Sequence, residues 1–315
     1  MILLVTYGDH ALSSLRRLVN DPEPQVRQEA RIALVAIAEI TGREIKLQPF
    51  RGIYIECLGR LRVYVGSHEM QSKDWVQAEA GRAGWQKVLG VLAYLVHCGQ
   101  RGTSRKALGE AVWGSAPSAS SLARTLTALH QALDKYTVGS DALERVLVIG
   151  SDFCLLGPEH YQTDVQMFER AYDLGVQYEQ DQGLALAVPL YTQVVQLYTG
   201  PYMTDVPRGS GWAWQRRQHL MSSFVLASER LAEYYYINRQ YKRCIEMCLS
   251  AIDVDDVADD IIVWLMRAYA QEGRNAELKQ IYRRYLRTMA IDPSDSGMQQ
   301  DGVVQEYKRL GIETE

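Results

Sequence analysis

Residues 119–135 read "ASSLARTLTALHQALDK", and this stretch decides how the middle of the chain is interpreted. Its apolar residues fall three and four positions apart, which places them on one side of an α-helix: Ala119, Leu122, Leu126, Leu129 and Leu133. The opposite side is small and polar: Ser120, Ser121, Arg124, Thr125, Ala128 and Gln131. The pattern predicts an amphipathic helix whose polar side either reads DNA or only meets solvent.

The segments before this helix supply its context. Residues 85–99 and 103–114 carry the same helical spacing, and Thr103 or Ser104 is placed to cap the second of these helices. Residues 53–65 alternate apolar and polar side chains at a period of two, which predicts strands, and Trp75 is expected to end a third short strand.

After the helix, residues 145–157 read as a hairpin turning at Gly150–Ser151. Strands, three helices and a closing hairpin follow one another in the order of a winged helix with an N-terminal sheet. The middle of the chain is therefore expected to be a winged helix-turn-helix domain over residues 50–157.

This region resembles the OmpR-type winged helix as it occurs in the Streptomyces antibiotic regulatory protein (SARP) family of transcription factors. The resembling stretches are "CLGRLRV" at 57–63, "LAYLV" at 92–96, "RKALGEAVWG" at 105–114, "SLARTLTALHQAL" at 121–133 and the hairpin at 145–157. The resemblance implies that 119–135 is the recognition helix, that it lies in the major groove and that the hairpin touches the neighbouring DNA backbone.

The following residues, 160–315, resemble the bacterial transcriptional activator domain that comes next in that family. The resembling stretches are "TDVQMFERA" at 163–171, "ALAVPLYTQVVQLYTGPYM" at 185–203 and "GWAWQRRQHLMSSFVLASERLAEYY" at 211–235. Residues 231–256 also parallel residues 265–293 as helix pairs similar to tetratricopeptide (TPR) repeats. Stacked pairs of this kind leave a concave surface that suits peptide docking.

Residues 1–45 resemble a single HEAT-type repeat. One helix is expected at 11–19 and a second at about 24–41, separated by the helix-breaking "NDPEP". One repeat cannot bury its own apolar faces, so this pair either packs on the rest of the chain or belongs to a longer solenoid. The predicted fold is thus mainly α with a small β component: a HEAT-like helical pair, a winged helix and a TPR-like helical domain.

Composition and charge set the class of protein. The 315 residues carry a net charge of −4, and 47% of them are hydrophobic, as in soluble globular proteins. Residues 51–157 hold 12 Lys and Arg against 9 Asp and Glu, whereas residues 158–315 hold 16 against 23. A mildly basic middle followed by an acidic end fits a nucleic-acid-binding module joined to a second domain.

Five cysteines without regular spacing argue against a disulfide framework and favour a reducing compartment. Residues 1–7, "MILLVTY", are too short for a secretion signal, and no apolar run is long enough to span a membrane. We expect a cytoplasmic protein. The sequence has no phosphate-binding loop, HExxH, GxSxG or dinucleotide-binding motif, so we expect no catalytic site, no cofactor and no metal site.

The residues expected to contact DNA fall in two groups. Arg124 is the outer-face side chain able to contact guanine, with Ser121, Thr125 and Gln131 placed for shorter polar contacts. The phosphate contacts are expected from Arg101, Arg105, Lys106 and Arg145. In the second domain, Phe168, Trp212 and Trp214 are expected to be buried.

The sequence favours a DNA-binding transcriptional regulator, acting as an activator. The resemblance implies that two copies bind adjacent direct repeats of double-stranded DNA and that the helical domain contacts RNA polymerase. The alternative is a non-catalytic protein-interaction scaffold, in which the winged helix is only structural. His130 and Gln131 favour the alternative, because the family usually carries a basic residue near this end of the helix.

Overall fold

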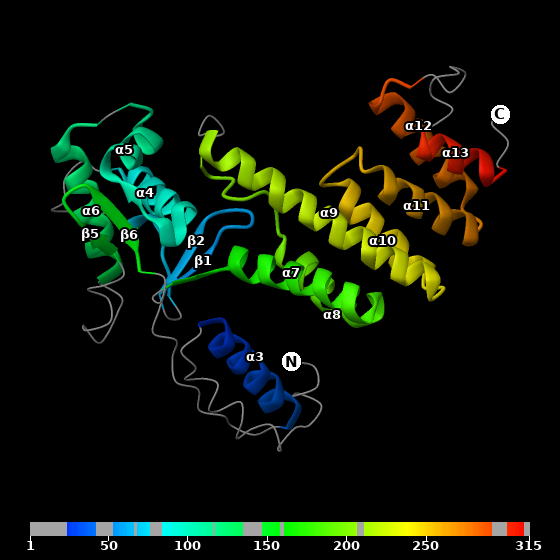
Figure 1. Ribbon diagram of the computed structural model, residues 1–315, viewed down its shortest axis with the longest axis horizontal. Helices are drawn as coiled ribbons and strands as arrows, with labels where there is room; N and C mark the ends of the chain where they lie inside the picture. The colour runs from blue at the N-terminus through cyan, green and yellow to red at the C-terminus, as the bar shows by residue number, and fades with distance from the viewer. Residues whose placement is uncertain are drawn as a thin grey trace. The chain divides into compact units, whose positions relative to one another are not determined.

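The computed structural model describes residues 24–41, 53–65, 68–75, 84–115, 117–134, 147–157, 161–206, 211–291 and 301–311 (Figure 1). The chain divides into two compact units. The first unit comprises Met1–Asp164 with Met203–Ala213, and the second comprises Val165–Tyr202 with Trp214–Glu315. Whereas the predicted domain ranges follow one another along the chain, the segment Met203–Ala213 returns to the first unit after part of the second has formed.

A four-stranded sheet opens the first unit. Its strands lie in the order β3 (His68–Glu69), β2 (Arg62–Val65), β1 (Ile53–Glu56) and β7 (Tyr161–Thr163). The pairs β3–β2 and β2–β1 are antiparallel, whereas β7 runs parallel to β1. The expectation that Trp75 ends a strand is wrong. Trp75 follows a single 3-10 turn over Ser72–Asp74, and its indole is buried.

Asp164 fixes the place where β1 ends. Its two carboxylate oxygens accept hydrogen bonds from the backbone amides of Cys57 and Leu58, at 2.7 and 2.8 Å. The returning segment continues this part of the unit, because the backbone amides of Met203 and Thr204 donate to the carbonyl oxygens of Cys57 and Gly59. Residues more than a hundred positions apart in the sequence thus meet around one strand end.

Three helices follow the first sheet: α4 (Trp85–Cys98), α5 (Arg105–Trp113) and α6 (Ala119–Asp134), and α4 packs against both of the others. They confirm the three predicted helices. Ser104 caps α5, since its hydroxyl accepts a hydrogen bond from the amide of Ala107 at 3.1 Å, and Gly114 ends it in the left-handed conformation.

A three-stranded sheet in the order β4 (Thr103–Ser104), β6 (Phe153–Leu156) and β5 (Leu147–Ile149) completes this arrangement. The β5–β6 hairpin is the predicted one, although its turn falls one residue later than expected. The amide of Gly150 donates to the carbonyl of Phe153 at 2.7 Å, so the two turn residues are Ser151 and Asp152. Three helices closed by a hairpin form a winged helix.

One helix of the expected HEAT-like pair is described, α3 (Pro24–Thr41), and its bounds match the predicted helix. The other, at 11–19, lies outside the described residues. Side chains of α3 at Ala30, Ala33 and Leu34 are buried, and α3 contacts β7. Within the first unit, therefore, α3 packs against the edge of the four-stranded sheet.

The elements that the structure describes in the second unit are all helices. Its helices are α7 (Asp164–Gln182, whose first residue belongs to the first unit), α8 (Leu184–Leu197), α9 (Trp214–Ile237), α10 (Tyr241–Ile252), α11 (Asp259–Gln271), α12 (Asn275–Thr288) and α13 (Gly302–Arg309). From α8 to α12 each helix packs on the next, and α13 packs on α11. The two segments that the sequence aligned, 231–256 and 265–293, contain the end of α9 with α10 and the end of α11 with α12.

The turns in this stack repeat one conformation. Arg239 lies between α9 and α10, Gly273 between α11 and α12, and Ala290 after α12, with φ of 58°, 69° and 52°. In each turn the next residue's amide donates to a carbonyl five positions back, for example Gln240 to Tyr235 and Arg274 to Tyr269. The left-handed residue closes the helix end and turns the chain toward the next helix.

Aromatic side chains form the core where α7, α8 and α9 meet. Phe168 is fully buried, as predicted, and the ring of Tyr198 stacks on Phe224 at 4.5 Å between centroids. The expectation that Trp214 is buried is wrong, because 63% of this residue is exposed at the first turn of α9. The spacing of α9 places Leu220 and Phe224 inward and leaves Trp214 on the other side.

The fold class is confirmed: the protein is mainly helical with small sheets, and a winged helix precedes a TPR-like helical unit. In the described part of the chain, no helix is both long enough and apolar enough to cross a membrane.

Candidate nucleic-acid interface

Helix α6 presents a continuous exposed stripe. The exposed residues fall three or four positions apart: Ser120, Ala123, Arg124, Thr127 and Gln131. On the other side, Leu122, Leu126, Leu129 and Leu133 are buried. Residues 119–133 contain no Asp or Glu, so the stripe carries no negative side chain to repel a phosphate backbone.

Arg124 lies near the middle of this stripe and is exposed. Its Nε donates a hydrogen bond to the carbonyl oxygen of Ser120 at 3.1 Å, which holds the side chain along the helix. No ion pair joins Arg124 to any other described residue. Its two terminal nitrogens can therefore donate together to O6 and N7 of a guanine, the most frequent specific contact in the major groove.

The structure corrects the predicted role of Thr125. This residue is 2% exposed, and its hydroxyl donates to the carbonyl oxygen of Ser121 at 2.9 Å. Thr125 therefore belongs to the inner side of α6, where it cannot reach a base. Thr127 is exposed in its place, with its hydroxyl donating to the carbonyl of Ala123 at 3.0 Å.

The sequence pattern did not single out Thr127 and Ala123, because the leucines were expected to lie at the centre of the buried side. Ala119, which was placed on that side, is exposed, and Ala128, which was placed on the polar side, is buried. The signal was present in the spacing, since 120, 124, 127 and 131 form a helical stripe of their own. Gln131 is exposed as expected, whereas Ser121 and His130 are half-buried.

The first turn of α6 is closed by Ser118. Its hydroxyl accepts a hydrogen bond from the amide of Ser121 at 3.2 Å and lies 3.2 Å from the hydroxyl of Ser120. Ser118 and Ser120 are both exposed, so the small hydroxyl-bearing end of α6 stays open to a ligand. Helix N-termini of this kind suit phosphate, because backbone amides and the helix dipole both favour negative charge.

The basic residues expected to grip phosphates gather where α5 begins. Arg101 is exposed in the short turn before β4, and the side chain of Lys106 is 80% exposed, 4.0 Å from Glu110. Arg105 is tied to the hairpin, since its amide donates to the carbonyl of Asp152 at 2.9 Å. Arg145, the fourth expected contact, lies outside the described residues.

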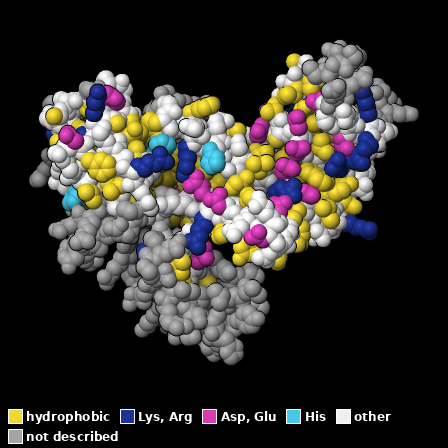
Figure 2. Space-filling view, viewed as in Figure 1, with side chains coloured by type: hydrophobic (Ala, Val, Ile, Leu, Met, Phe, Trp, Pro, Cys, Tyr) yellow, Lys and Arg dark blue, Asp and Glu magenta, His cyan; other side chains and the backbone are white. Residues whose placement is uncertain are grey.

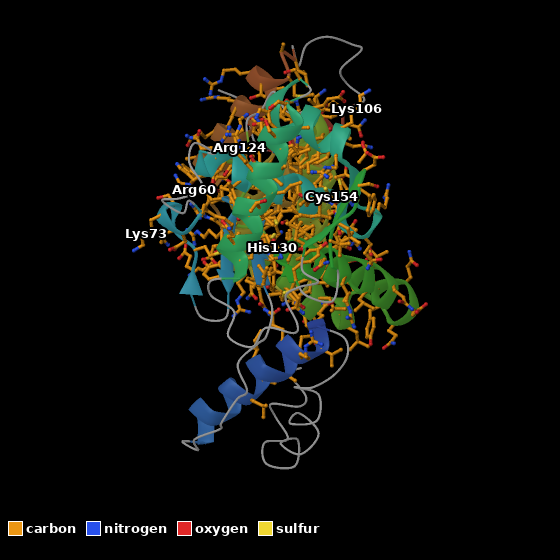
Figure 3. The ribbon with its side chains drawn as sticks, turned by 90° about the vertical axis from the view of Figure 1, so that its left-hand side faces the viewer. Arg60, Lys73, Lys106, Arg124, His130 and Cys154 are labelled. Atoms are coloured by element: carbon orange, nitrogen blue, oxygen red, sulfur yellow. The ribbon has the colours of Figure 1, made fainter. Side chains whose placement is uncertain are left out.

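Two of the predicted contact residues, Arg124 and Lys106, are labelled in Figure 3. Figure 3 shows Arg124 and His130 along α6, with Lys106 toward one side and Arg60 and Lys73 toward the other. Cys154 lies in the hairpin sheet, where burial raises the pKa of its thiol and so keeps it protonated. The hairpin also exposes apolar side chains: Val148, Ile149 and Phe153.

The second unit offers a different surface. Over the face drawn in Figure 2, acidic and basic side chains are interspersed on the helices of this unit. Several of its arginines are already paired, for example Arg216 with Glu169 at 2.7 Å and Arg230 with Glu179 at 2.6 Å. On this face, therefore, the second unit shows no patch of a single sign that would attract DNA.

The helical unit also carries the family's sequence pattern. Residues 163–294 match the bacterial transcriptional activator domain. In this activator domain Phe168 and Leu220 are fully buried, and Arg217 donates to the carbonyl oxygen of Tyr202 at 2.7 Å. These positions of the pattern thus have structural roles inside the unit.

Among solved structures, the chain resembles EmbR of Mycobacterium tuberculosis, determined in complex with a low-affinity phosphopeptide. The TM-score is 0.62 at 19% sequence identity, and the match covers 82% of this chain. The chain spans 64% of the length of the EmbR chain that it matches. No curated protein matches the sequence. At this level of identity, the likeness to EmbR shows the fold.

Proposed function

We propose that this protein is a DNA-binding transcriptional regulator in which α6 lies in the major groove. The observation that carries the proposal is the exposed stripe of α6, which offers Arg124, Thr127 and Gln131 without an acidic neighbour. A helix presents its side chains to base edges in this way in helix-turn-helix proteins, where the preceding helix crosses the backbone.

The backbone contacts in this proposal come from the start of α5 and from the hairpin. Arg101, Arg105 and Lys106 are the cations just before and at the start of α5. They neutralise phosphates and fix the register of α6, whereas Arg124 reads a base. Arg145 is proposed to add a further phosphate contact.

The helical unit is proposed to serve protein contacts, namely pairing of two copies on adjacent sites and contact with RNA polymerase. The match to the activator domain supports this role. The proposed regulator acts in the cytoplasm on double-stranded DNA and uses no cofactor.

Selection of bound sequences from random double-stranded DNA tests the proposal, using the full chain at low salt. We expect a defined sequence to be enriched. Arg124→Ala is expected to weaken binding to that sequence by about 1–3 kcal/mol and to relax the preference at one base pair. Arg284→Ala is the matched control, because Arg284 is an exposed arginine of α12 in the second unit.

Two results would overturn the proposal. The first is that no sequence is enriched at low salt, and the second is that Arg124→Ala and Arg284→Ala retain DNA equally. Either result would favour the interaction scaffold, in which the stacked helix pairs α9–α10 and α11–α12 bind a protein partner and the winged helix is structural.

A further inference from the structure

The first unit contains a pocket of about 560 Å³ whose lining includes no residue of α6. It is formed by the start of α4, the end of α5, the residues before β2 and the returning segment. The lining residues are Arg60, Leu61, Trp85, Gln86, Lys87, Leu89, Gly90, Ala111, Val112, Asp205, Val206 and Trp212. Its volume falls within the range of about 300–1,000 Å³ that is usual for small-molecule sites.

The inner part of this pocket is apolar. Leu61 and Val206 are buried, and Leu89, Val112 and Trp212 are half-buried. The indole of Trp212 is held from behind by aromatic contacts, with its centroid 5.2 Å from Tyr94 and 4.7 Å from His97. The pocket is therefore a preformed apolar surface with a fixed aromatic wall.

Two hydrogen-bond donors of the pocket are unused. The Nε1 atom of Trp212 is buried and has no hydrogen-bond partner. A buried indole N–H of this kind normally finds an acceptor, because leaving it unpaired is costly. The Arg60 guanidinium, at the exposed rim, forms no hydrogen bond or ion pair with any residue that the structure describes.

The other cation of the pocket is already engaged. The Lys87 Nζ donates to the carbonyl oxygen of Val112 at 2.8 Å and lies 5.3 Å from the centre of the Trp113 ring. Lys87 therefore ties α4 to the end of α5 and serves as a wall of the pocket. Arg60 remains as the cation available to a ligand.

We propose that this pocket binds a small carboxylic acid with an apolar body. The apolar body lies against Leu61, Val206 and the Trp212 indole. The carboxylate accepts hydrogen bonds from the Arg60 guanidinium and, once the side chains that cover it shift, from the buried Trp212 Nε1. The site is independent of the α6 stripe, so its test does not depend on DNA binding.

The probe is 4-phenylbutyrate, and binding to the full chain is followed by ligand-observed NMR. An acid of this size in a preformed pocket is expected to bind with a Kd of about 1 mM or tighter. Its neutral amide, 4-phenylbutyramide, keeps the apolar body and loses the charge, so it is expected to bind about tenfold more weakly.

Matched variants locate the site. Arg60→Gln is expected to raise the Kd of the acid about tenfold and to leave that of the amide nearly unchanged. Its control is Arg62→Gln, two residues away and outside the pocket. Trp212→Phe keeps the aromatic wall and removes the N–H, so it is expected to raise the Kd about threefold or more. Its control is the exposed Trp214→Phe.

Ala111→Leu completes the set, because a larger side chain at this lining position reduces the volume of the pocket. We expect it to abolish binding while circular dichroism reports a folded protein. The proposal is overturned if the acid shows no saturable binding, or if the amide binds as well as the acid. It is also overturned if Arg60→Gln and Trp212→Phe bind the acid as their controls do.

Discussion

The backbone amide of Arg105 donates a hydrogen bond to the carbonyl oxygen of Asp152, 2.9 Å away. This contact joins the first residue of α5 to the turn of the β5–β6 hairpin, and β4 pairs with β6 directly beside it. The cations at the start of α5 and the tip of the hairpin therefore keep a fixed spacing. Such pre-organisation lowers the cost of binding to a rigid DNA backbone.

Gly102 makes this junction possible. Its φ is +60°, and a Cβ atom there would lie 2.1 Å from Cζ of Phe153. Gly102→Ala is therefore expected to lower the free energy of unfolding by about 1–2 kcal/mol, measured by urea denaturation, because alanine is strained at positive φ and the exposed Phe153 ring must turn aside. In the double variant with Phe153→Ala the steric part disappears, so a cost of about 1 kcal/mol from the positive φ remains. Equal costs in both backgrounds would show that the ring does not limit this site.

Helix α6 is oriented so that Thr125 is buried and Thr127 is exposed. Thr127→Ala is expected to change the selected DNA sequence without changing the urea midpoint, because Thr127 is exposed. Thr125→Ala is expected to lower the free energy of unfolding by about 1–2 kcal/mol, since Thr125 is buried, and to leave the selected sequence unchanged. The opposite result for the two variants would show that Thr125, and not Thr127, faces the DNA.

The proposed phosphate contacts predict a salt dependence of DNA binding. With about four such contacts, the slope of log affinity against log salt is expected to be near −3 to −4. Arg105→Ala keeps the backbone bond to Asp152 and removes one charge, so it is expected to flatten the slope by about one and to weaken all DNA sequences alike. Fluorescence anisotropy over a salt series measures the slope. An unchanged slope would exclude Arg105 as a phosphate contact.

The repeated turns of the helical unit predict a stabilising change. Arg239 holds the left-handed conformation that glycine occupies at the equivalent position, Gly273. Arg239→Gly is expected to raise the free energy of unfolding by about 0.5–1 kcal/mol, because glycine adopts positive φ without a steric penalty. The reciprocal control, Gly273→Ala, is expected to lower it by about 1 kcal/mol. A loss of stability in Arg239→Gly would mean that the arginine side chain stabilises the turn.

The lowered pKa of Glu306 predicts that the protein loses stability in acid. Burial by itself raises its pKa, but hydrogen bonds from Arg267 and Arg309 outweigh this effect and lower the pKa to about 2. Because the folded-state pKa lies below the ordinary value of about 4.3, the stabilisation is present above that value and is lost as the pH falls toward about 2.

Urea denaturation between about pH 6 and about pH 3 measures this contribution, which linkage puts at about 2–3 kcal/mol. Glu306→Gln is expected to unfold more easily at the higher pH and to lose less stability on acidification than the wild type. Glu246→Gln, on an exposed residue of α10, is the control and should keep the wild-type pH dependence. Identical pH profiles for all three proteins would rule out Glu306 as the acid-sensitive group.

The sequence by itself determined the local elements of this protein. The spacing of Leu122, Leu126, Leu129 and Leu133 gave α6 its bounds, and Ser104 marked the start of α5, because helix periodicity and capping depend on residues within one or two turns. The β5–β6 hairpin followed from period-two alternation, and only its turn moved by one residue. The alignment of two helix pairs likewise corresponds to the end of α9 with α10 and the end of α11 with α12.

The tertiary structure decided which side of each helix is buried and which is exposed. Thr125 is buried because its neighbours on α6 define a wide buried arc and its hydroxyl bonds to the carbonyl of Ser121, a pairing that polarity alone does not reveal. Trp214 is exposed because α9 packs through Leu220 and Phe224, although a tryptophan is usually read as core.

The sequence also did not predict contacts between distant segments, because these depend on how the elements pack. The carboxylate of Asp164 binds amides at Cys57 and Leu58, and the segment Met203–Ala213 returns to the first unit beside them. The pocket lined by Arg60 and Trp212 exists only because of that return. Periodicity reports which side of an element is apolar, whereas packing between distant segments determines which polar groups are satisfied and which remain open to a ligand.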